Sequence, residues 1–176
     1  MKKFLILLLA VTGLIACEKI DELTHFTLDV DEQISIDPIP VIPSIPLNIP
    51  IPSVETNSES VFENNNTNKD LVEEARLTKM TMSIDTPSNG NFNFLESVNI
   101  YISAEGLDEI LMATRSSIPD GLKVLELEPT GADLTEYVKK DEISLRVEAT
   151  IDEITLNEYS IDVHSEFFID AKILGI

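Results

Sequence analysis

Apolar and polar residues alternate along much of the chain after residue 23, and this alternation predicts β-strands. The longest such runs are residues 143–151 and 161–169, in which every second position is apolar with the exception of Ser165. A period of two places the apolar side chains on one face of a strand and the polar ones on the other. We expect these two runs to be joined near Asn157 as an antiparallel hairpin with one buried face and one wet face.

Shorter runs of the same kind predict the remaining strands. They are residues 24–36, 75–85, 98–103, 110–114 and 123–127. A turn rich in breakers is expected at 86–91, and residues 105–108 are expected to connect a hairpin. Helical turns are expected only at 92–96 and 133–140.

These elements together predict an all-β fold. About seven short strands, few glycines and no long helix are typical of an antiparallel β-sandwich. The expected sandwich is immunoglobulin-like in architecture, with at most short helical turns. The likeness concerns architecture alone, because the chain has no tryptophan and its single cysteine cannot form the disulfide of antibody domains.

Residues 37–52 combine prolines with large aliphatic side chains, and six of the nine prolines lie there. Proline lacks the backbone N–H and fixes φ, so a central strand is excluded and an extended polyproline II or edge segment is expected. A free linker is usually polar, so we expect this segment to lie along the domain and bury its aliphatic side chains. The alternative is a docking strip for a partner. Its binding residues would be Ile39, Val41, Ile42, Ile45, Leu47, Ile49 and Ile51.

Residues 53–70 are polar and include the Asn-rich tract at 64–68. Asn, Ser and Thr favour turns and loops over the interior of strands. We therefore expect a surface loop between the proline-rich segment and the strand at 75–85.

The N-terminus has the pattern of an export signal. Two lysines precede an apolar run at residues 4–15, which is too short for a permanent membrane helix but fits a secretory signal. The run ends in Leu14-Ile15-Ala16-Cys17. This tetrapeptide resembles the lipobox of bacterial lipoproteins. The resemblance implies transfer of diacylglycerol to the Cys17 thiol, cleavage after Ala16 and acylation of the new N-terminus.

This resemblance divides the chain into three parts. They are a cleaved lipoprotein signal peptide at 1–16, a lipidated tether at 17–23 and a single β-sandwich domain at 24–176. The tether residues EKIDE resemble the export signal of surface-exposed lipoproteins of the Bacteroidota type. The resemblance implies a lipid-anchored protein on the cell-surface side of the outer membrane, with the periplasmic face as the alternative. The rest of the chain looks like small β-rich lipoproteins of that group, a resemblance that carries no activity with it.

The chain is strongly acidic, with 12 Lys and Arg against 32 Asp and Glu and a formal net charge of −20. Loss of the signal peptide would remove two lysines and make this charge more negative. Nucleic acid and anionic lipid both need a basic protein surface, so neither is expected to bind through charge. Membrane attachment is expected through the lipid alone. Acylation of the only cysteine would leave no disulfide, so the fold must rest on its core.

No sequence pattern assigns catalytic or metal-binding residues. The two histidines, His25 and His164, have no cysteine or second histidine at metal-ligand spacing. Carboxylates are too numerous for any one pair to indicate glycoside hydrolysis. A structural calcium ion at 29–32 is an alternative, although the usual DxDxDG loop is absent; otherwise no cofactor is expected. Tyr101 and Tyr159 are candidates either for exposed sugar-stacking rings or for residues at the rim of the core.

The expected function is that of a non-enzymatic binding or structural module at the cell envelope. Its partner would be an outer-membrane protein or an extracellular ligand. One alternative is an accessory subunit of an outer-membrane export or uptake complex, which a stoichiometric barrel partner would indicate. The other is a hydrolase of envelope polymers such as glycans, which a deep pocket with converging Asp, Glu or His side chains would indicate.

Overall fold

The computed structural model describes residues 24–41, 46–56 and 58–172. The predicted lipidation site Cys17, the signal peptide and the tether lie outside these residues, as do Ile42 and Ile45 of the proline-rich segment. No helix within the described ranges is long and apolar enough to cross a membrane.

Eight β-strands and a few short helical segments make up the described residues. In chain order they are β1 (His25–Ile36), β2 (Leu47–Glu55), α2 (Ser58–Asn64), the 3-10 turn η1 (Lys69–Leu71), β3 (Val72–Thr86), the 3-10 turn η2 (Phe92–Phe94), β4 (Leu95–Ala104), β5 (Leu107–Arg115), β6 (Val124–Pro129), α3 (Thr135–Val138), β7 (Glu142–Ile151) and β8 (Tyr159–Ala171). Every predicted strand is present, and the helical turns expected at 92–96 and 133–140 are η2 and α3.

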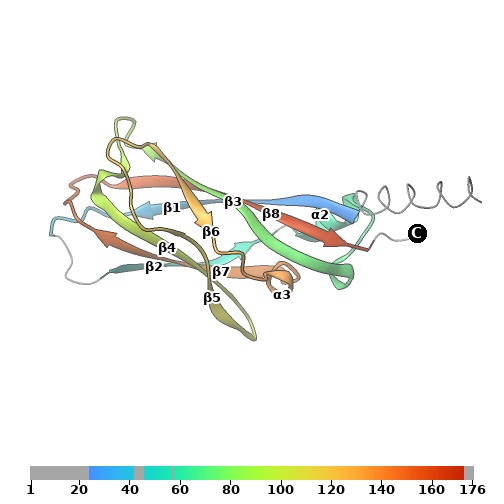
Figure 1. The fold of residues 1–176 in the computed structure, drawn as a ribbon. Helices are drawn as coiled ribbons and strands as arrows, with labels where there is room; N and C mark the ends of the chain where they lie inside the picture. The colour runs from blue at the N-terminus through green and yellow to red at the C-terminus, as the bar shows by residue number, and fades with distance from the viewer. Residues whose placement is uncertain (1–23, 42–45, 57, 173–176) are drawn as a thin grey trace, which may run out of the picture.

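All the strands belong to one antiparallel sheet with the order β1-β8-β3-β6-β5-β4-β7-β2. The sheet curls over, so that β1, β8 and β3 form one layer and β5, β4, β7 and β2 form the other (Figure 1). β6 pairs with both β3 and β5 and so joins the two layers. One cluster of buried apolar side chains, including Leu28, Met80 and Ile100, fills the space between them. The prediction of an all-β antiparallel fold is confirmed, and the structure adds that its layers are parts of one continuous sheet.

The prediction that the two C-terminal strands pair as a hairpin is wrong. β7 lies between β4 and β2, whereas β8 lies between β1 and β3, so the two strands belong to opposite layers. Each strand has the predicted alternation of buried and more exposed positions. Alternation identifies the face of a strand that meets the core but carries no information about its neighbours. Residues 152–158 therefore cross from one layer to the other instead of turning a hairpin.

The long strand β3 changes the face that it presents to the core. Leu77 and Met80 are both buried, although an unbroken strand would turn odd and even positions to opposite faces. A register shift between Leu77 and Lys79, opposite β8, resolves this conflict, because a bulge adds one residue and reverses the alternation. Met80 and Met82 lie beyond this shift and are both buried, as the alternation within a strand requires.

Residues 53–70 are not the surface loop expected from their polarity. β2 continues to Glu55, and α2 follows with Phe62 at 1% exposure. The ring of Phe62 meets that of Phe26 of β1 edge-on, with 5.9 Å between the ring centroids. Thr56 and Thr67 are buried and donate hydrogen bonds to backbone carbonyl oxygens. The ring of Phe62, together with Val54, Val61 and a set of satisfied hydroxyl groups, holds this polar segment on the core.

The second half of the proline-rich segment forms the edge strand β2, so the exclusion of a central strand is confirmed. Leu47, Ile49 and Ile51 are half-buried and pack against the core. Proline is tolerated at an edge because only one side of the strand needs its hydrogen-bond donors.

Candidate functional site

A polar cluster covers the outward face of the layer formed by β5, β4, β7 and β2. Alternation along β7 turns Arg146 and Glu148 away from the core. The register places Arg146 between Pro50 of β2 and Tyr101 of β4. The Arg146 cluster, as we name it, consists of Asn48, Asn99, Tyr101, Glu109, Arg146 and Glu148.

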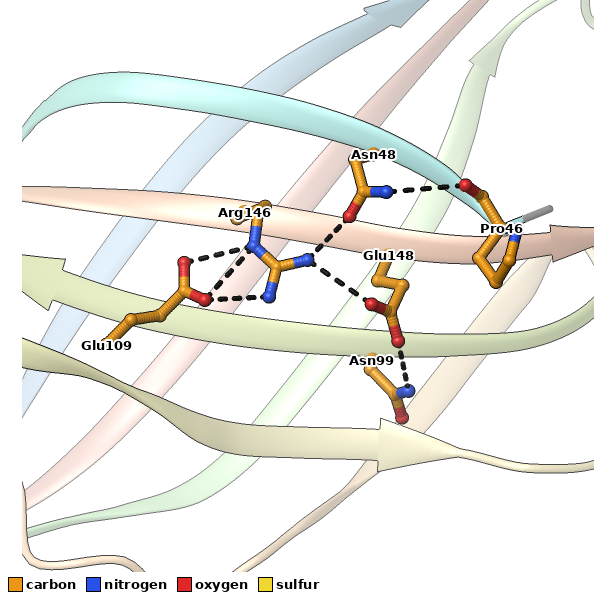
Figure 2. A network of polar contacts seen from close by, with 6 residues as sticks. All are labelled: Pro46, Asn48, Asn99, Glu109, Arg146 and Glu148. Carbon is orange, nitrogen blue, oxygen red and sulfur yellow. Dashed lines mark hydrogen bonds and ion pairs between the residues drawn. The ribbon is translucent and has the colours of Figure 1, made fainter.

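The guanidinium of Arg146 is engaged on nearly every side (Figure 2). Its Nε and Nη2 donate to the carboxylate of Glu109 at 3.0 and 2.7 Å, which makes a bidentate pair. Its Nη1 donates to Asn48 at 2.6 Å and to Glu148 at 3.4 Å. The guanidinium also lies over the ring of Tyr101, 4.0 Å from the ring centroid. One side chain thus connects β7 to β2, β4 and β5.

The charges in the Arg146 cluster stabilise one another. Hydrogen bonds from Arg146 lower the pKa of Glu109, and the acceptor oxygens of Glu109 and then Glu148 raise the pKa of Arg146. Most of the guanidinium N–H groups are already used. The Arg146 cluster is therefore better suited to linking neighbouring strands than to binding an anionic ligand.

The other layer carries a row of charged side chains around His164 and Glu166 of β8. Asp31 of β1 lies directly opposite His164, and its carboxylate is 2.7 Å from Nδ1. Glu166 accepts a hydrogen bond from Nζ of Lys79 at 2.7 Å and lies 3.4 Å from Nε2 of His164. The bond to Asp31 raises the pKa of His164, and the bond from Lys79 lowers the pKa of Glu166. This row connects β1, β8 and β3 on their exposed face.

An open hollow of about 590 Å³ lies beside α2. Its lining residues are all polar: Glu55, Thr56, Ser58, Glu59, Ser60, Glu63, Asp141 and Glu142. Each of the five carboxylate side chains is exposed, and Nζ of Lys69 lies 3.0 Å from Asp141. The general acid of a glycoside hydrolase typically lies against an apolar wall. The hollow fits a hydrated acidic surface better than a catalytic cleft.

Large apolar side chains are exposed where the β1–β2 and β7–β8 connections meet. The backbone N–H of Thr155 donates to the carbonyl oxygen of Ile39 at 2.9 Å and holds the two connections together. Val41, Ile154 and Leu156 are 73%, 53% and 72% exposed. We name these three residues the apolar tip. Exposed aliphatic side chains on adjacent connections can provide a contact surface for another protein.

The described residues of the proline-rich segment that were predicted as possible partner-binding residues fall into a group packed on the core and one exposed residue. Leu47, Ile49, Ile51 and Ile39 pack against the core, as expected for an extended segment lying along the domain. Only Val41 among the described members points into solvent.

The two tyrosines considered as sugar-stacking rings are not free platforms. Tyr159 is buried and packs against Phe94, with 4.7 Å between the ring centroids. Tyr101 is half-buried and lies beneath Arg146. Both are therefore at or near the rim of the core, which was the alternative.

Sequence reasoning missed two features of this surface. The Arg146 cluster depends on register between strands far apart in the chain, which no local pattern reveals. Ile154 and Leu156 did carry a signal, because they are aliphatic residues in a connection that interrupts two alternating strands.

No protein-family model and no curated protein matches the chain. Among solved structures, the decameric BFDV capsid protein is similar over 82% of this chain and 99% of its own, at 10% identity and a TM-score of 0.32. The match to the structure of infectious bursal disease virus Gt strain spans 84% of this chain and 32% of the viral chain, at 10% identity and a TM-score of 0.37. The crystal structure of FLHE covers 84% and 98%, at 5% identity and a TM-score of 0.39. Likeness at this level carries no information about activity.

Proposed function

We propose that the chain is a protein of the bacterial outer membrane, anchored by lipid attached to Cys17. Its β-sandwich would be a non-enzymatic binding or structural module. We infer the lipid anchor from the tetrapeptide Leu14-Ile15-Ala16-Cys17, which ends a short apolar run. Three acyl chains on Cys17 would hold the protein in the bilayer, since each buried methylene contributes about 0.8 kcal/mol. The proposed location is the cell-surface side, for which the charged tether EKIDE is the support.

The direction of β1 supports a role in presentation. β1 begins at His25, only a few residues after Cys17, and its 12 residues extend over roughly 40 Å. The apolar tip lies beyond its far end, because Ile36 pairs with Tyr159 and Ile39 with Thr155. A lipid at Cys17 would therefore hold one end of the sandwich near the bilayer and leave the tip away from it.

A second candidate is an accessory subunit of an outer-membrane export or uptake complex. The specific support is the apolar tip, since exposed Val41 and Leu156 would be covered in a permanent complex. Purification of the lipidated protein from native membranes in mild detergent distinguishes the two. A stoichiometric barrel protein indicates a subunit, and its absence indicates a free-standing module.

The anchor is tested by the substitution Cys17→Ser. Without the thiol no diacylglycerol can be attached, so we expect the variant to leave the membrane fraction while the wild type stays there after a salt wash. Incorporation of labelled palmitate into the wild type alone is the second readout. Retention of the serine variant in salt-washed membranes would contradict the proposed anchor.

A further inference from the structure

The two outer strands of the sheet, β1 and β2, have free edges of different chemistry. β2 contains Pro50, which lacks the backbone N–H. Proline in an edge strand is tolerated where its N–H would face away from the neighbour, so this residue removes a donor from the free edge of β2. β1 contains no proline, and its pairing with β8 has no register shift from His25 to Ile36. The free edge of β1 is the longer and more regular one.

The backbone of β1 has N–H and C=O groups on its free edge that can form further hydrogen bonds. In an antiparallel pair, the N–H and C=O groups of alternate residues point toward the partner and the others point away. β8 uses one side of β1, and no strand or backbone hydrogen bond among the described residues uses the other side of 25–36. Such an edge is a template for adding another strand.

The surface beside this edge is open and acidic. A hollow of about 400 Å³ lies where β1 pairs with β8, and Asp31, Glu32, Gln33, Asp162 and Val163 line it. Asp29 and Asp31 lie on the outward face of β1, and Glu32 is half-buried on the other face. An apolar strand added here would meet carboxylates on both faces, whereas a basic one would be attracted.

Charges along the sheet rows leave Asp29 without a direct ion pair, although its carboxylate attracts Lys79 and His164 at longer range and helps to raise the pKa of each. In its row Lys79 of β3 pairs with Glu166 of β8, and Glu166 lies opposite Asp29 of β1. No described side chain forms an ion pair or hydrogen bond with Asp29. Opposite charges on directly paired positions stabilise a sheet and like charges destabilise it. A Lys or Arg on an added strand next to Asp29 would complete this row.

The same charges argue against a second copy of this chain as the occupant. Two β1 strands related by a two-fold axis through their middle would bring Asp29 of one copy opposite Asp31 of the other. Like charges would then face each other twice in one short ladder. The net charge of −20 per chain adds long-range repulsion.

We propose that the free edge of β1, centred on Asp29 and Asp31, binds an extended segment of a partner protein that carries Lys or Arg at alternate positions. The segment adds a strand to the sheet through main-chain hydrogen bonds, and its basic side chains pair with Asp29 and with the oxygen of Asp31 that does not contact His164. This inference rests on the proposed binding function and names the surface and the chemistry of the partner.

The test uses the full-length lipidated protein in detergent and a labelled synthetic peptide that alternates Lys with Val. We expect saturable binding with slowed amide hydrogen exchange along β1. Asp29→Lys combined with Asp31→Lys is expected to weaken binding by about tenfold or more, because two attractive pairs become repulsive. The matched control combines Glu96→Lys of β4 with Glu105→Lys just after β4, which are exposed carboxylates of the other layer and change the net charge equally. It is expected to weaken binding by less than about threefold.

Two further peptides separate main-chain pairing from attraction by charge alone. One carries N-methyl groups on its lysines and the other on its valines, so each keeps its positive charges but loses the donors on one edge. The form whose methylated edge faces β1 should not bind. The inference is overturned if both methylated forms bind like the parent, if the two double variants weaken binding equally, or if the parent does not bind. None of these results would alter the membrane fractionation of Cys17→Ser, which tests the anchor separately.

Discussion

The guanidinium of Arg146 binds side chains of β2 and β5 while it lies over Tyr101 of β4. The side-chain bond from Arg146 to Asn48 adds a link between β7 and β2 to the backbone pairing of these two strands. Alternation places Arg146 outward, but only the register reveals which strands it connects.

Removal of the Arg146–Glu109 pair should destabilise the protein measurably. In a double-mutant cycle of Arg146→Ala and Glu109→Ala, we expect a coupling free energy of about 0.5–1 kcal/mol, since the pair is bidentate but partly exposed. Chemical denaturation of the four proteins measures it. The exposed Arg115–Glu128 pair, 3.3 Å apart, is the control and should couple less. A smaller coupling for Arg146 than for this control would contradict its role as a tie.

His164 makes part of the stability depend on pH. Its pKa in the folded protein is raised above the ordinary value of about 6.5, first by the hydrogen bond to Asp31. The stabilisation is therefore fully present below about pH 6.5 and is lost as the pH rises through the raised value. The melting temperature of His164→Gln should fall further below the wild type at about pH 5.5 than at about pH 8. The control Asp31→Asn should reduce that difference, and a gap that widens with rising pH would refute the prediction.

Helix α2 illustrates how little apolar surface is needed to fix an element. Phe62 is its largest buried side chain, and it meets Phe26 close to the start of β1. The segment is predicted to be a loop because its composition is polar, and two adjacent apolar residues, Val61 and Phe62, do not produce a helical period. A short element held by tertiary contact is thus the kind of element that a local pattern misses.

Truncation of this ring should therefore be costly. Phe62→Ala is expected to lower the free energy of unfolding by about 3–4 kcal/mol, because it removes a fully buried aromatic side chain and leaves a cavity. Phe62→Leu, which keeps most of the volume, should cost much less. Urea denaturation of both variants measures the difference. A loss below about 1 kcal/mol for the alanine variant would mean that α2 contributes little to the folded state.

At the scale of the whole molecule, the sequence predicted the all-β class and nearly every strand, but not the order of the strands. The alternation in 143–151 and 161–169 places the right residues in the core. It does not reveal that β7 and β8 lie in opposite layers, because both layers use the same core. The candidate surfaces were predictable to the same degree. Val41 belongs to a segment recognised from its prolines, whereas its proximity to the β7–β8 connection depends on the Ile39–Thr155 bridge.

The place of β8 has a consequence for how the chain is made. Of the described strands β8 is synthesised last, yet it lies between β1, the first of them, and β3. Until its 13 residues have emerged, β1 has no described neighbour in the sheet and β3 lacks its longest pairing. Contacts between the two ends of a chain are the slowest to form. Until synthesis reaches Ala171, β1 therefore lacks its described partner and β3 has only β6 beside it, which leaves strand edges open to aggregation or proteolysis.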